Sequence, residues 1–394
     1  MSIDLSRVRS DTPGTANVVH LNNAGAALPP RQVLQAVQQH LEREAAIGGY
    51  EAAAEAAGAI EGVYGSIARL VNAAPDEIAV VENATRAWDM AFYSFGFGPG
   101  DRILTAQAEY ASNYLAFLQV ARRTGAVIEV VPNDNGGALD PHALERMIDG
   151  RVKLIAITHI PTNGGLVNPA EAVGRIARAH GIPYLLDACQ SVGQMPVDVE
   201  ALGCDMLSAT GRKFLRGPRG TGFLYVRRGL IGRLEPPFID LHSADWTGAD
   251  TYEFRADARR FENWECFVAG KIGLGAAADY AMSLGLDAIR ERAWSLADRL
   301  RTGLAAIPGT RLRDLGDMRS AIVSFTIDRI DPAAVKQRLA QQTINVTVSG
   351  LTSTRLDMAA RQLQSVVRAS PHYYNSEEEI DRALEAIAGI ARSA

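Results

Sequence analysis

The chain has 394 residues, of which 47% are hydrophobic and 22% are charged, and its formal net charge is -5. This composition is that of an ordinary globular protein, and it excludes a disordered chain, a fibre and a disulfide scaffold. The weak negative charge argues against nucleic acid as a partner, and the lack of a long apolar run argues against a membrane.

A chain of this length is expected to divide into domains. Residues 1–30 are predicted to form an N-terminal arm, residues 31–265 a large domain and residues 266–394 a small C-terminal domain. A helical pattern over residues 30–44 follows the arm.

Short apolar runs alternate with helical stretches through the large domain. The predicted strands cover residues 77–81, 102–106, 127–131, 153–158, 183–187, 205–209 and 222–226. This alternation indicates an α/β fold with a mostly parallel seven-stranded sheet between helices. The smaller domain is predicted to be α+β. Its helices are expected over residues 270–284, 287–304 and 377–388, and its strands over residues 320–327 and 344–348.

Polar residues follow several of these strands, at the edge where open α/β sheets bind ligands. Asp187 ends one strand and is suited to pair with the protonated ring nitrogen of pyridoxal 5′-phosphate (PLP), although capping the next helix explains it equally well. Lys213 follows another strand, and the neighbouring Arg212 favours the neutral amine that a Schiff base requires. Thr210 and Arg212 can bind phosphate, but a basic surface loop is the alternative.

Ala84 and Thr85 stand where a predicted strand gives way to a helix. Free N–H groups and the positive end of the helix dipole make such a junction an anion site. An ordinary helix cap at Thr85 is an equally good interpretation.

Together these motifs resemble the class V aminotransferase family of fold-type I PLP-dependent enzymes. Asp187 opens the run Asp-Ala-Cys-Gln-Ser-Val-Gly, Lys213 stands 26 positions later, and Gly-Pro-Arg-Gly-Thr-Gly follows. The family includes cysteine desulfurases, selenocysteine lyases, isopenicillin N epimerases and ergothioneine C–S lyases. The resemblance runs from Asn22 to Asn375 and implies a PLP cofactor, an amino acid substrate and a homodimer with shared active sites.

The resemblance assigns catalytic roles to Lys213, Asp187 and Tyr110. Lys213 would carry the cofactor and move a proton at the substrate α-carbon, Asp187 would pair with the ring nitrogen, and Tyr110 would stack on the ring. The implied cofactor contacts are Ala84, Thr85, Tyr110, Thr162, Asp187, Gln190, Thr210, Arg212 and Lys213.

Substrate contacts are implied for residues near both ends of the chain. Arg368 resembles the arginine that binds the α-carboxylate as a planar fork, with Arg355 assisting. Asn23 and Gly25 would pass over the substrate, although surface arginines and a simple turn explain the same residues. The segment 260–265, which contains Trp264 and Glu265, resembles a loop that reaches the partner subunit, but its Trp-Glu departs from the Gly-Thr of desulfurases.

The three cysteines guide the choice of reaction. A persulfide-forming desulfurase is expected to carry an acceptor thiol between residues 343 and 366. Cys189, Cys204 and Cys266 all lie elsewhere, which disfavours that activity. Their odd number and their spacing predict a reducing cytoplasmic location and no metal site.

Tyr110, the Gly48-Gly-Tyr50 run and Gly211 before Arg-Lys resemble ergothioneine C–S lyases. The predicted reaction is therefore β-elimination from an S-substituted cysteine. Transamination, epimerisation and decarboxylation stay open as alternatives. A nucleotide-binding dehydrogenase is disfavoured because the glycines at 96–100 follow a helical stretch, and a non-catalytic protein of this fold is a minority interpretation.

Overall fold

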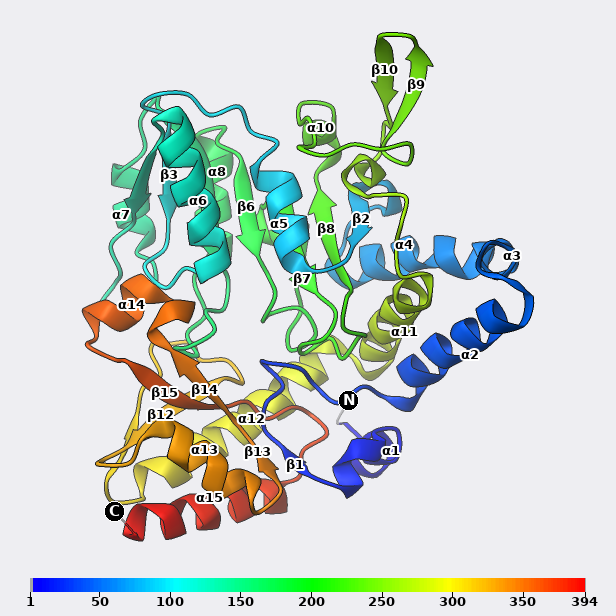
Figure 1. Ribbon diagram of the computed structural model, residues 1–394. Coiled ribbons are helices and arrows are strands. Elements are labelled where there is room, and N and C mark those ends of the chain that lie inside the picture. Colours follow the sequence, from blue (N-terminus) through cyan, green and yellow to red (C-terminus); the bar gives the residue numbers. More distant parts are fainter. Residues whose placement is uncertain (1–2, 394) are drawn as a thin grey trace.

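The computed structural model describes residues 3–393, and a seven-stranded sheet lies at the centre of its large domain (Figure 1). The strand order is β2-β8-β7-β6-β5-β3-β4. The strands are β2 (Ile78–Val81), β3 (Arg102–Thr105), β4 (Val127–Val130), β5 (Val152–Thr158), β6 (Tyr184–Asp187), β7 (Met206–Thr210) and β8 (Gly222–Val226). β8 runs antiparallel to both of its neighbours, and the other pairs are parallel. The predicted fold class is confirmed.

Helices cover both faces of this sheet because both faces of its strands are apolar. Along β6, Leu185 packs with α5 and α6 on one face, whereas Leu186 packs with α7, α8 and α11 on the other. The helices of the large domain are α2 (Arg31–Ile47), α3 (Gly49–Glu55), α4 (Ala57–Val71), α5 (Ala84–Phe92), α6 (Ala111–Thr124), α7 (Pro141–Arg146), α8 (Ala170–Ala179), α9 (Val199–Leu202), α10 (Arg228–Ile231) and α11 (Val268–Leu284). The predicted helix over residues 270–284 is therefore α11, and it packs against α2 and α4.

The small domain is built on an antiparallel sheet with its own apolar core. The strand order is β11-β12-β15-β14, with β11 (Thr310–Leu312), β12 (Val323–Ile327), β14 (Thr347–Gly350) and β15 (Ser365–Ala369). Its helices are α12 (Leu286–Ala305), α13 (Pro332–Ala340), α14 (Arg355–Ala360) and α15 (Glu377–Arg392). The single strand predicted over residues 344–348 is wrong in detail, because the chain breaks into β13 (Ile344–Asn345) and β14.

The N-terminal arm joins the small domain. After α1 (Leu5–Ser10), β1 (Val19–His20) pairs in parallel with β13. Arg216, which follows β7, fixes the arm: it donates to the Thr12 hydroxyl at 2.6 Å, to the Leu28 carbonyl at 2.8 Å and to the Tyr373 hydroxyl at 2.5 Å. The loop that carries Lys213 is thus tied to both ends of the chain. The predicted boundaries between the three domains stay predictions.

A projecting hairpin was not predicted from the sequence. Strands β9 (Ala244–Gly248) and β10 (Thr251–Phe254) form it, and it stands clear of the main body in Figure 1. Its two strands alternate apolar and polar residues over only four positions each, and most of their side chains are exposed, so the pattern is too short to mark a half-buried strand. Trp246 is the extreme case, with 82% of its surface exposed.

Within residues 3–393, no helix is both long enough and apolar enough to cross a membrane. The same part of the chain contains no group of three or more histidine, cysteine, aspartate or glutamate side chains placed to hold a metal ion.

Candidate active site

Two of the predicted catalytic residues lie at the same edge of the sheet. Asp187 is the last residue of β6, and it is in register with Ser208 of the parallel strand β7. Lys213 follows the end of β7 by three residues. The carboxyl ends of parallel strands therefore bring the carboxylate and the amine into one site, as open α/β sheets do.

The amine of Lys213 lies among charged groups and is partly shielded from bulk water. Loss of hydration lowers the pKa of Lys213, and the positive charges of Arg212 and Arg368 lower it further, whereas Cys189 and Asp187 oppose the shift. Its Nζ lies 5.9 Å from the centre of the Tyr110 ring. Since only a neutral amine attacks a carbonyl carbon, this setting favours the reactive form of Lys213.

Asp187 is held in one orientation by two donors. Its Oδ1 accepts a hydrogen bond from the Cys189 backbone N–H at 2.9 Å, and its Oδ2 accepts one from Asn113 Nδ2 at 2.9 Å. Each carboxylate oxygen can accept more than one bond, so both keep room for a further donor.

The N-terminus of α5 opens toward the same side of the sheet. Asn83 caps the helix by accepting from the Arg86 N–H at 2.9 Å, and Ala84 and Thr85 form its first turn. Strand β8 passes close by, because a Cβ on Gly222 would lie 2.7 Å from the Asn83 carbonyl carbon. Only glycine permits this approach, and the helix end is left as an anion site.

Thr210 and Arg212 were predicted to complete the phosphate site. Thr210 ends β7 and its hydroxyl donates to the Thr221 carbonyl at 3.4 Å. The guanidinium of Arg212 contacts the carbonyl of Gly25, so it holds the N-terminal arm against the site. Their contact with phosphate stays a prediction.

Arg368 of the small domain adds a positively charged guanidinium to the site. It lies on β15, is buried, and donates through Nη1 to the Thr162 carbonyl at 3.2 Å and to the Thr162 hydroxyl. Burial lowers the pKa of Arg368 to about 10. Its Nε–H has no partner among the described residues. A buried guanidinium with a free N–H needs an anion, and a carboxylate is the matching shape.

Gln190 links the N-terminal arm to Thr162. Its Nε2 donates to the Ala24 carbonyl at 3.1 Å and to the Thr162 hydroxyl at 3.5 Å. Its Oε1 is buried without a partner within residues 3–393. A polar ligand that donates to this oxygen would satisfy it, which fits the predicted place of Gln190 beside the cofactor.

The other predicted substrate residues have different partners. The Asn23 amide is buried, donates to the Ser370 carbonyl at 2.7 Å and accepts from the Tyr374 hydroxyl. Gly25 offers its carbonyl to Arg212, and Arg355 is an exposed residue at the start of α14. Asn23 and Gly25 therefore connect the arm to the rest of the protein, and substrate contacts by any of the three stay predictions.

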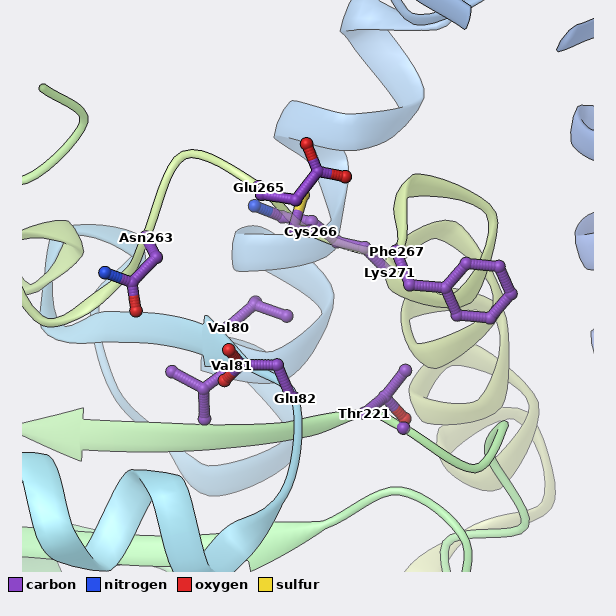
Figure 2. A pocket seen from close by; sticks show the side chains of 10 residues that line it. Val80, Val81, Glu82, Thr221, Asn263, Glu265, Cys266, Phe267 and Lys271 are labelled. Carbon is purple, nitrogen blue, oxygen red and sulfur yellow. The ribbon is translucent and has the colours of Figure 1, made fainter. Parts of the chain in front are cut away.

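The segment predicted to reach a partner subunit lies beside the end of β2. Figure 2 shows Glu265 and Cys266 above a small pocket that Glu82 and Thr221 also line. Glu262 fixes the start of the segment: its buried carboxylate accepts from the Val80 N–H at 2.7 Å. The segment is thus held next to the turn that leads into α5.

Two buried residues of the site were not assigned a role from the sequence. Glu109 and Asn113 lie on either side of Tyr110 in the sequence, and Asn113 Nδ2 donates to both Glu109 and Asp187. The available signal was the presence of two polar residues between the end of β3 and the first turn of α6, at the edge of the sheet where open α/β folds bind ligands.

These groups fit PLP. Lys213 offers an amine to its aldehyde, Asp187 a carboxylate to its ring nitrogen, and the first turn of α5 a set of N–H groups to its phosphate. The unpartnered atoms of Gln190 and Arg368 lie among the same residues. The arrangement suits a cofactor together with an amino acid bearing a carboxylate.

The family model described as aminotransferase class-V matches residues 19–383. The chain belongs to this family. A probable cysteine desulfurase of Methanothermobacter thermautotrophicus is 32% identical over 395 residues, which cover 97% of this chain and 98% of the relative. A cysteine desulfurase of Serratia proteamaculans is also 32% identical, covering 100% of this chain and 98% of the relative. The predicted family and PLP cofactor are confirmed.

Solved structures agree with the family. The apo structure of a cysteine desulfurase from Thermococcus onnurineus NA1 superposes with a TM-score of 0.93 and 28% identity, covering 100% of this chain and 99% of that one. A structure of a C-DES mutant with glycine covalently linked to its PLP cofactor shares the fold, with a TM-score of 0.85 and 24% identity over 96% of this chain and 98% of that one.

The predicted C–S lyase activity is wrong, because the relatives about 32% identical to this chain, and the solved structure 28% identical to it, are named cysteine desulfurases or probable cysteine desulfurases. The error came from treating the missing thiol between residues 343 and 366 as decisive. That segment does lack a cysteine, and Cys189 and Cys204 are buried. Members of a family keep the same fold and cofactor while local segments vary, so one missing side chain does not exclude the reaction.

Lys213→Ala should abolish covalent attachment of the cofactor. The purified protein is loaded with PLP, treated with borohydride and digested, and the modified peptide is identified by mass spectrometry. The label is expected on Lys213 and absent in the variant, while the exposed Lys153→Ala control keeps it. Label on any other lysine of the native protein would contradict the assignment.

Proposed function

We propose that this chain removes the sulfur atom of cysteine in a PLP-dependent reaction, which is the activity that the names of its relatives state. The observation that supports it is the meeting of Lys213, Asp187 and Arg368 in one buried site, since the charges of Asp187 and Arg368 both act on the Lys213 amine. Amine, carboxylate and guanidinium are the groups that an amino acid and PLP need at one place.

Each of the three groups has a separate task. Arg368 binds the α-carboxylate and so places the α-carbon near Lys213. PLP, when bound, withdraws electrons from that carbon. The Lys213 amine then takes the α-proton and returns a proton to the carbon skeleton after sulfur has left. Asp187 would hold its carboxylate toward the ring nitrogen, and Tyr110 would cover one side of the ring near Lys213.

A nucleophilic thiol must accept the sulfur atom that is removed from cysteine. Cysteine and a thiol R–SH give alanine and the persulfide R–S–SH: the C–S bond of cysteine breaks, an S–S bond forms, and no outside oxidant is needed. Burial raises the pKa of the Cys189 and Cys204 thiols, which keeps them protonated and unreactive, whereas Cys266 is exposed. All three thiols are free, which supports a reducing cytoplasmic location.

Loaded enzyme given cysteine and a low-molecular-weight thiol such as dithiothreitol should release alanine and sulfide, measured by mass spectrometry and a sulfide assay. Alanine should form at the same rate in Cys266→Ser if the acceptor comes from solution, and should fall if Cys266 is the acceptor. Pyruvate and ammonia without alanine, or amino transfer that needs a 2-oxo acid, would overturn the proposed reaction.

Arg368→Gln should weaken cysteine binding, because it removes a charged partner of the α-carboxylate. Loss of such a hydrogen bond corresponds to about 1.5 to 3 kcal/mol, or a rise in KM of roughly ten- to a hundredfold. Steady-state kinetics of alanine formation gives KM and kcat separately. The exposed Arg338→Gln serves as the control, and an unchanged KM in the Arg368 variant would remove its role.

We also propose that two copies assemble and share their active sites. A cavity of about 910 Å³ lies at the surface beside the segment that follows Glu262. Tyr50, Trp264 and Phe267 line it and expose 79%, 52% and 44% of their surfaces. Apolar side chains gathered in this way support an interface. Analytical ultracentrifugation should give twice the mass of the chain, and a monomer at micromolar concentration would contradict the assembly.

A further inference from the structure

Two buried carboxylates of the site are joined by one amide. Asn113 Nδ2 donates to Glu109 Oε1 at 2.8 Å and to Asp187 Oδ2 at 2.9 Å. All three side chains are buried, with at most 5% of each residue exposed. An amide nitrogen carries two protons, so both are used in this bridge and its geometry is fixed.

Four neighbouring residues donate hydrogen bonds to the Glu109 carboxylate. Besides Asn113, the Thr158 N–H and the Tyr110 N–H each donate to it at 2.9 Å, and the Thr105 hydroxyl donates at 3.2 Å. Donors aimed at a carboxylate stabilise its negative form. Glu109 is therefore built to be an anion, even though it lies inside the protein.

The pKa of Glu109 lies near neutral pH, because opposing effects act on this carboxyl group. Burial and the charge of Asp187 raise its pKa, the hydrogen bonds from Thr158 and Asn113 lower it, and together they place it at about 7. The charge of Glu109 in turn contributes to raising the pKa of the buried Tyr184 phenol. The main contributions to the Glu109 pKa come from burial, from hydrogen-bond donors and from the negative charge of Asp187. A cation bound beside Asp187 would therefore favour the negative form of Glu109.

We propose that Glu109 is a positioning residue that, through Asn113, orients Asp187 and adds a second negative charge that keeps the ring nitrogen of PLP protonated. This role rests on the proposed function, because it requires Asp187 to face that nitrogen. Asp187 would contact the ring nitrogen, and Glu109, on the other side of the Asn113 amide, would add its negative charge.

The test uses PLP labelled with ¹⁵N at the pyridine nitrogen, whose chemical shift reports protonation directly. In the native loaded protein the ring should stay protonated through neutral pH and lose its proton only near the alkaline end of the pH range in which the protein is folded. In Glu109→Gln the ring should lose its proton at a pH lower by about one unit, because one nearby negative charge is gone. The kcat for alanine should fall most at high pH, with KM little changed.

Two further variants separate charge from structure. Thr105→Val removes one hydrogen bond to Glu109 and keeps the charge, so its ¹⁵N shift should match that of the native protein. Asn113→Leu keeps both carboxylates and removes the bridge that orients Asp187, so the ring nitrogen should again lose its proton at a lower pH than in the native protein. This variant replaces Glu109→Gln in the test if Glu109→Gln fails to fold. Urea unfolding shows which variants are folded.

An unchanged ¹⁵N titration in whichever of Glu109→Gln and Asn113→Leu folds would overturn the role of Glu109. The measurement needs no turnover of cysteine. If the titration shifts as expected but no alanine forms, the proposed function fails and the link between Glu109 and Asp187 stands.

Discussion

The burial of ionisable groups around Lys213 is the constraint that the rest of the structure satisfies. An amine, two carboxylates and a guanidinium can leave bulk water only if each is held by partners, because an unpaired charge inside a protein is costly. Asn113 donates to both carboxylates, and Thr162 accepts from Arg368. The charge of Asp187 favours the protonated Lys213 amine, whereas the charge of Arg212 favours its neutral form. Strands β5, β6 and β7 and the small domain are arranged so that these partners meet.

The relation between family and reaction is instructive in this protein. The fold and cofactor follow from groups that cannot be replaced, such as the amine of Lys213 and the carboxylate of Asp187. A sulfur acceptor differs from them, since any thiol that reaches the site performs the same step. The lack of a cysteine between residues 343 and 366 therefore limits where the sulfur goes, and it says little about whether the C–S bond breaks.

Much of the large domain could be predicted from the sequence because its strands are apolar on both faces and end at polar residues. Asp187 and Lys213 were found in this way, since Asp187 ends such a run and Lys213 follows another by three residues. The pairing of Arg368 with Thr162 could not be derived, because the two residues lie 206 positions apart and meet only after the two domains fold. The bridge from Asn113 to Asp187 was missed for the same reason, with 74 positions between its ends. Hairpin β9–β10 was missed because its alternating runs are only four residues long and pack on no core of the described chain.

The pairing of β1 with β13 sets an order of events during synthesis. Val19 and His20 are made long before their partners Ile344 and Asn345. Strand β1 must therefore wait without its partner until synthesis has passed Asn345. The arm beside the cofactor site can take its final place only after that point, when most of both domains has already been made.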